Sequence, residues 1–78
     1  MNLPAETWFA LHLWGRRSGH LADWQAGIAH TLSSYAGGGW QKVPTLKQAR
    51  QGIRIIEIAK ENGFDPAVAA DVARLQDI

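Results

Sequence analysis

The 78-residue chain has no cysteine and no long apolar run. The absence of cysteine excludes disulfides and thiolate chemistry, which fits a reducing compartment. No apolar run approaches the roughly 18 residues of a membrane-spanning helix, and the residues from Met1 to Glu6 lack the positive charge of a secretory leader. We therefore expect a soluble, cytoplasmic protein with no membrane contact.

The chain also has little net charge. At +1, non-specific attraction to nucleic acid or anionic lipid is too weak to dominate binding. The distribution of charge is uneven, because one stretch without acidic residues contains four bases, Lys42, Lys47, Arg50 and Arg54. From Glu57 onward acidic residues outnumber basic ones.

The short length limits how large a core the chain can build. A domain of this size buries only about 60–65% of the surface that its unfolded chain exposes. A second copy of the chain is a common stabiliser at this length. We expect a single domain, 1–78, and a possible homo-oligomer.

The spacing of apolar residues predicts an all-α fold, a compact four-helix domain with helices at about 4–14, 19–35, 46–62 and 66–77. Two helical hairpins would be joined by the glycine-rich loop. The first helix would begin at Pro4, which suits a first helical position, and end at Gly15. It is apolar on nearly every side, so it must be covered on every side.

The second helix is predicted to begin at Ser18 as its N-cap. One apolar stripe follows three- and four-residue steps and consists of Leu21, Trp24, Ile28, Leu32 and Tyr35. This stripe places Trp24 in the core. Beside it runs a row of small residues, Ala22, Ala26, Ala29 and Ser33, which lets a neighbouring helix approach closely.

The third helix has the clearest boundaries. Thr45 and Gln48 match a capping box, and Gly63 matches a C-terminal stop. Its predicted core line consists of Leu46, Ala49, Ile53, Ile56 and Lys60, and the line is widened by Ile55, Ile58 and Ala59. Asp65 and Pro66 then predict the cap and first position of the fourth helix, with Val68, Val72 and Leu75 facing inward.

Residues 58–74 have the layout of a helix-turn-helix, with Ala59, Gly63 and Phe64 at the turn. The second of these helices offers alanines, a proline and Asp71 where a DNA-reading helix needs side chains that reach base edges. The pattern therefore favours a structural hairpin.

Catalytic and metal motifs are weak in this sequence. None of His12, His20 and His30 pairs with another histidine or a carboxylate at four-residue spacing, so a zinc site would have to be assembled from long-range contacts. The glycine triplet lacks the Lys-Ser/Thr ending of a phosphate-binding loop. We expect no enzymatic activity and no cofactor, and a small hydrolase using His20 or His30 is a third-ranked hypothesis.

Four tryptophans are more aromatic surface than so small a core comfortably hides. Trp8 and Trp14 lie six residues apart and cannot share one face of a helix. At least one of them is expected to be covered by something outside the core. Tryptophan and arginine are also the residues that most often dominate binding energy at interfaces.

These observations favour a non-catalytic protein-binding module, an adaptor or steric inhibitor of another protein, with self-association through the first helix. Its size is that of accessory proteins, including phage-encoded inhibitors of host machinery. The predicted binding residues are aromatic anchors and bases that would steer an acidic surface: Trp8, Trp14, Trp40, Arg16, Arg17, Lys42, Lys47, Arg50 and Arg54. The alternative is nucleic-acid or nucleoprotein binding through the basic face of the third helix, which Lys47, Arg50 and Arg54 would form.

The segment "GGGW", residues 37–40, places a tryptophan after three flexible glycines. The glycines can end the second helix and reverse the chain. We expect Trp40 to fold back as a lid over the first or second helix. The alternative is that Trp40 points outward as an interface anchor.

Overall fold

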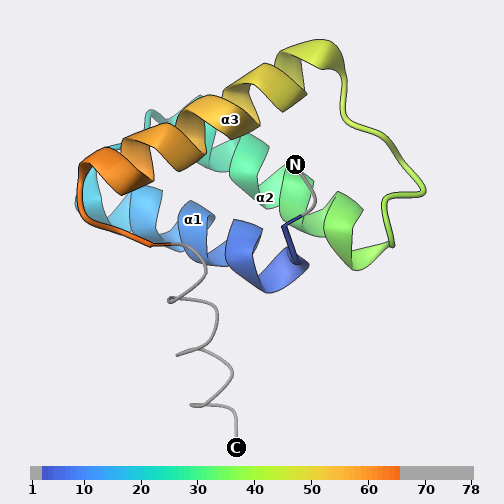
Figure 1. Cartoon of the computed structure of the whole chain (residues 1–78), viewed down its shortest axis with the longest axis horizontal. Helices are drawn as coiled ribbons and strands as arrows, with labels where there is room; N and C mark the ends of the chain where they lie inside the picture. The colour runs from blue at the N-terminus through green and yellow to red at the C-terminus, as the bar shows by residue number, and fades with distance from the viewer. Residues whose placement is uncertain (1–2, 66–78) are drawn as a thin grey trace, which may run out of the picture.

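The computed structural model describes residues 3–65, which form three α-helices. These are α1 (Ala5–Ser18), α2 (Asp23–Gly37) and α3 (Leu46–Glu61) (Figure 1). The all-α prediction is confirmed for this part of the chain. The predicted fourth helix, 66–77, lies outside the described residues, so the four-helix arrangement is not confirmed.

Helices α1 and α2 form an antiparallel hairpin, and α3 lies across it, returning toward the end of α1 (Figure 1). The loop from Gly38 to Thr45 connects α2 to α3 on the opposite side of the molecule. Within residues 3–65, no helix has the length and apolarity needed to cross a membrane.

The first helix is longer than predicted, because Gly15 does not end it. Gly15 is buried inside α1, and α1 continues to Ser18. The actual stop is Gly19, whose φ of 74° lies in the left-handed region and whose N–H donates to the Gly15 carbonyl. A glycine inside a helix looks like a stop in the sequence, but here its missing side chain makes room for Leu21.

The second helix begins later than predicted, with Ala22 as N-cap. Ser18 does not cap it. Instead the Ser18 hydroxyl donates to the Trp14 carbonyl at 2.6 Å and accepts from the His20 N–H at 3.3 Å, so it helps to end α1. Ala22 has no side-chain acceptor, and its own N–H donates to Gln25 Oε1 at 3.0 Å.

Half of the predicted small-residue row of α2 is buried against α1, whereas Ala22 is exposed and Ser33 is half-buried. Ala26 and Ala29 are buried, and they face a hairpin partner whose Trp8 and Leu11 are also buried. The prediction for Trp24 is wrong, because its side chain is 56% exposed. The alanines let α1 and α2 approach closely. Leu21 and Leu32 of the predicted stripe are buried with them, and Trp24 alone of that stripe is exposed.

The capping box of α3 is confirmed. Gln48 N–H donates to Thr45 Oγ1 at 3.1 Å, and Thr45 N–H donates to Gln48 Oε1 at 2.9 Å. The predicted stop is confirmed as well, since Gly63 has a φ of 75°. At the end of α3, Gly63 N–H donates to the Lys60 carbonyl and Phe64 N–H to the Ala59 carbonyl, which together form a Schellman motif.

The buried face of α3 confirms the predicted Ile55 and Ala59, but not the predicted central line through Leu46 and Ile53. Leu46 is 67% exposed and Ile53 is 50% exposed, whereas Gly52, Ile55 and Ala59 are buried. Two apolar lines on one helix compete for the core. The line containing Gly52 and Ala59 is favoured because small residues allow close contact with the hairpin.

The lid prediction for Trp40 is confirmed. Trp40 is half-buried and packs against the core cluster formed by Trp8, Leu11, Leu21, Ala29, Leu32, Ile55 and Ala59. The end of α2 is a second Schellman motif, in which Gly39 N–H donates to the Ala36 carbonyl and Trp40 N–H to the Tyr35 carbonyl. In α2 as in α3, a glycine at positive φ is followed by an aromatic residue that returns to the core.

Candidate functional site

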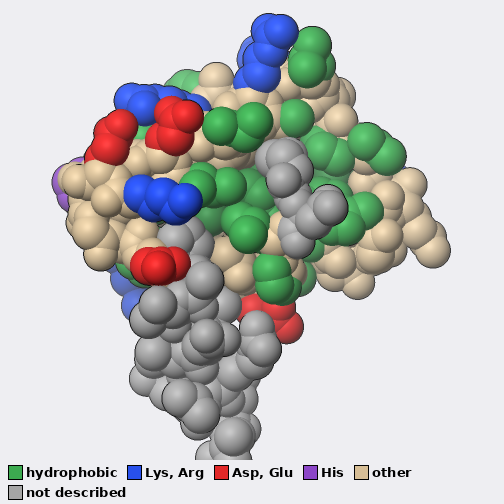
Figure 2. Space-filling model, in the orientation of Figure 1, with side chains coloured by type: hydrophobic (Ala, Val, Ile, Leu, Met, Phe, Trp, Pro, Cys, Tyr) green, Lys and Arg blue, Asp and Glu red, His purple; other side chains and the backbone are tan. Residues whose placement is uncertain are grey.

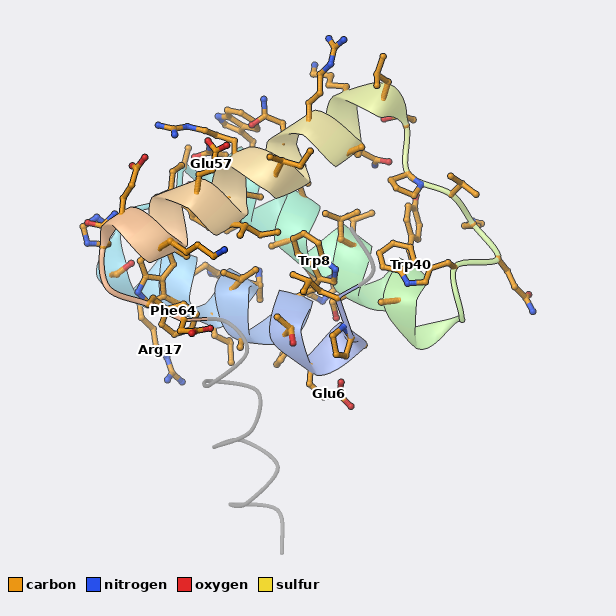
Figure 3. The ribbon with its side chains drawn as sticks, in the orientation of Figure 1. Glu6, Trp8, Arg17, Trp40, Glu57 and Phe64 are labelled. Atoms are coloured by element: carbon orange, nitrogen blue, oxygen red, sulfur yellow. The ribbon has the colours of Figure 1, made fainter. Side chains whose placement is uncertain are left out.

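An open hollow of about 420 Å³ lies where the end of α1 meets the end of α3. Arg17 and Phe64 mark this end of the molecule in Figure 3. The lining is mostly apolar and consists of Ala10, Leu13, Trp14, Arg17, Ser18 and Phe64. We call this feature the α1-end hollow.

Two turns of the backbone build the hollow. The extension of α1 past Gly15 adds the turn that contains Arg17 and Ser18. The Schellman motif at Gly63 reverses the chain after α3 and brings Phe64 back onto α1. Both stops are glycines at positive φ, Gly19 and Gly63.

Trp14 is the centre of the site because two other aromatic rings stack on its indole ring. The Phe64 ring stacks on it with centroids 5.1 Å apart and an angle of 18°, and the His20 ring stacks with centroids 5.4 Å apart and an angle of 22°. Offset stacking of this kind contributes about 0.5–1.5 kcal/mol per pair beyond burial. The stack holds Trp14 in a fixed orientation.

Arg17 gives the hollow its charge. Its side chain is exposed, and it lies one turn of helix from Trp14. An exposed guanidinium beside an apolar surface can bind a carboxylate in a bidentate manner while a neighbouring apolar group is buried. The α1-end hollow therefore suits a ligand that combines an apolar group with an acidic one.

The structure separates the predicted binding residues into five places. Trp14 and Arg17 meet in the α1-end hollow. Trp8 is fully buried, so it is a core residue and contacts no partner in this fold. Trp40 packs on the core as a lid. Arg16 lines a second hollow, of about 270 Å³, with His12, Asp23, Ala26 and Gly27.

The remaining predicted bases, Lys42, Lys47, Arg50 and Arg54, are exposed in the loop before α3 and on α3 itself. Arg16 and Arg17 do not join them, because the end of α1 lies beside the end of α3 and far from its start (Figure 1). The predicted binding bases therefore do not form a single surface.

Arg54 is partly neutralised within α3. Its guanidinium lies 3.3 Å from a Glu57 carboxylate oxygen and 3.6 Å from a Glu61 oxygen. Figure 2 shows basic and acidic side chains interleaved where α3 ends. All three side chains are at least half exposed, so each pair contributes at most about 1 kcal/mol. Arg50 and Arg54 lie four residues apart on α3, where like charges repel, and these two acids offset part of that repulsion.

Sequence reasoning missed Phe64, Ala10 and Leu13 as site residues. The signal for Phe64 was present, since a Schellman motif commonly brings the residue after its glycine back onto the helix. The positions of Ala10 and Leu13 depend on how α3 crosses the hairpin, which no local pattern specifies. The sequence also gave no sign of a histidine pair, His12 and His30, whose ring centroids lie 5.0 Å apart.

Within residues 3–65, no group of three or more His, Cys, Asp or Glu side chains is placed to hold a metal ion. Comparisons with protein-family models, with curated proteins and with solved structures find no match to this chain. The case for a function therefore depends on the geometry of the molecule itself.

Proposed function

We propose that this domain is a non-catalytic protein-binding module, an adaptor or steric inhibitor, that binds its partner at the α1-end hollow. The observation that supports the proposal is the placement of Trp14 and Arg17 together in an open, mostly apolar hollow. Trp and Arg are the residue types most enriched among binding hot spots.

The hollow defines the chemistry of the partner. A leucine-sized or aromatic side chain would fill the space above Leu13 and Phe64, and a carboxylate beside it would pair with Arg17. An acidic, partly apolar surface or segment has both properties. The stacking around Trp14 favours binding, because an anchor that is already ordered loses little entropy on association.

Other apolar side chains are also exposed on the described residues and could contact a second copy of the chain. Phe9 is 44% exposed, and Trp24, Leu46 and Ile53 are each at least half exposed. Scattered apolar residues are normal on a protein surface. Self-association through these side chains is part of the proposal, and sedimentation across micromolar concentrations tests it, because a strict monomer throughout would contradict it.

The binding proposal is tested by capture of a partner with matched variants. The full chain is immobilised, incubated with lysate of its native cell and cross-linked, and the captured proteins are quantified by mass spectrometry. Arg17→Glu is the test variant, because Arg17 is exposed and its change leaves the core intact. Lys47→Glu is the control, since Lys47 has the same charge and is also exposed, but lies at the start of α3.

We expect a protein that is captured by the natural chain and by Lys47→Glu, and that is lost or reduced at least tenfold with Arg17→Glu. Leu13→Glu should give the same loss. Capture that is unchanged by both Arg17→Glu and Leu13→Glu would contradict binding at the hollow.

A second candidate function is nucleic-acid binding through the start of α3. The supporting observation is that Lys42, Lys47 and Arg50 are all exposed in a stretch with no acidic residue between Asp23 and Glu57. Phosphate binding should weaken log-linearly with salt, and Lys47→Glu with Arg50→Glu should abolish it. Binding that survives both changes would exclude this surface.

A further inference from the structure

The fold brings together two histidines from different helices. His12 lies in α1 and His30 in α2, and their ring centroids are 5.0 Å apart with an angle of 65° between the rings. The pair lies in the α1–α2 seam, and neither histidine lines the α1-end hollow.

The tautomer of His12 is set by a hydrogen bond. His12 Nδ1 lies 2.8 Å from the Ala26 carbonyl oxygen. A carbonyl oxygen only accepts, so Nδ1 carries the proton and donates it. In the neutral ring, the Nε2 atom therefore keeps its lone pair. A histidine whose other nitrogen donates to a backbone carbonyl is the usual arrangement of a metal ligand.

Phe9 restrains both rings. Its ring centroid lies 5.7 Å from that of His12 and 6.2 Å from that of His30. His12 is half-buried and His30 is exposed, so an ion can reach the pair from solvent. Arg16 and Asp23 line a hollow together with His12, so the formal charges beside this histidine are of opposite sign.

The spacing of the rings is that of an edge-to-face contact, and it is also compatible with one ion shared by both rings. Two imidazoles that bind one zinc ion at about 2.1 Å in tetrahedral geometry have ring centroids about 5 Å apart. We infer that His12 and His30 form a two-imidazole site for a divalent transition-metal ion such as Zn²⁺ or Ni²⁺. Water completes the coordination of the ion, which joins α1 to α2.

The test uses the full chain without a histidine tag, because a tag would itself bind the ion. Thermal unfolding and isothermal titration are measured with ZnCl₂ and with NiCl₂. His30→Ala is the main variant, since His30 is exposed and its loss leaves the core unchanged. His12→Gln is the second variant. His20→Ala is the matched control, because the His20 ring stacks on Trp14 instead.

We expect each ion to raise the melting temperature of the natural chain, because an ion that binds only the folded state stabilises it. His30→Ala and His12→Gln should each lose at least about tenfold in affinity, and His20→Ala should keep it. No binding at millimolar ion, binding that is unchanged in His30→Ala, or an equal loss in His20→Ala would overturn the inference. Partner capture has no part in this readout, so the site and the proposed function are tested separately.

Discussion

Leu21 packs against the backbone of Gly15 so closely that a Cβ atom on Gly15 would lie 2.8 Å from the Leu21 Cβ and 2.6 Å from its Cγ. Leu21 is buried, so it cannot turn outward to make room. Its Cβ moves only with its backbone. The contact joins the middle of α1 to the connection that leads into α2.

Gly15→Ala should therefore destabilise the fold. Alanine normally favours a helix interior by about 1 kcal/mol over glycine, but overpacking of a core typically costs about 1–3 kcal/mol. We expect the second effect to be the larger, with a net loss in the free energy of unfolding by urea titration. Gly27 is the matched control, because it lies inside α2 and a Cβ there would meet no atom within 4 Å. Gly27→Ala should stabilise by about 0.5–1 kcal/mol. Equal effects of the two substitutions would disprove the role of the Gly15–Leu21 contact.

Trp40 has a φ of 60°, in the left-handed region that costs most residues about 1–2 kcal/mol. Trp40→Ala should keep this cost and lose the packing of the indole, whereas Trp40→Gly loses the packing but removes the cost. We therefore expect Trp40→Gly to be the more stable of the two variants by about 1 kcal/mol. Chemical denaturation of both variants checks the order. The usual order, with alanine the more stable, would contradict the backbone conformation at this position.

The two N-caps offer opposite changes. Thr45→Ala removes the side-chain acceptor for the Gln48 N–H and should cost about 1 kcal/mol. Ala22→Ser adds an acceptor at the start of α2, where Gln25 already accepts from the Ala22 N–H. It should stabilise by about 0.5–1 kcal/mol. Melting temperatures of the two variants should move in opposite directions, and a decrease in both would show that α2 does not begin at Ala22.

Two tryptophans should respond very differently to truncation. Trp8 is fully buried, and Trp8→Ala should cost at least about 3 kcal/mol. Trp24 is 56% exposed, and Trp24→Gln should change stability by no more than about 0.5 kcal/mol. Circular dichroism during thermal unfolding gives both values. A large loss of stability in Trp24→Gln would show that Trp24 is a core residue, as the sequence pattern suggested.

Local patterns predicted the helical class and the boundaries of α3, because a capping box and a C-terminal glycine act within a few residues. They did not predict the end of α1. A glycine that ends a helix and a glycine that leaves room for a neighbouring side chain cannot be told apart in the sequence, and Gly15 is of the second kind. The exposed Trp24 and Ile53 show the same limit. An apolar stripe shows which faces of a helix can be buried, and the choice between faces depends on which neighbour can approach most closely.

The candidate site was predicted in part. Aromatic residues and arginines were selected by type, which included both Trp14 and Arg17. Their meeting with Phe64 depends on the angle at which α3 crosses the hairpin, and that angle is set by Gly52, Ile55 and Ala59 packing on residues distant in the sequence. The separation of Arg17 from Lys47 and Arg50 has the same origin.

The packing of α3 on the hairpin also affects how its backbone amides exchange with solvent. The connection from α1 to α2, residues 19–22, is shorter than the loop 38–45 that precedes α3, so closing the hairpin loses less chain entropy than docking α3 does. The large buried side chains of the hairpin and its connection are Trp8, Leu11, Leu21 and Leu32, whereas Ile55 is the one large side chain that α3 buries, beside Gly52 and Ala59. Backbone amides of α3 should therefore exchange with deuterium through a partial opening that leaves the hairpin closed. Amides at the centre of α1 and α2 should exchange only when the whole domain unfolds.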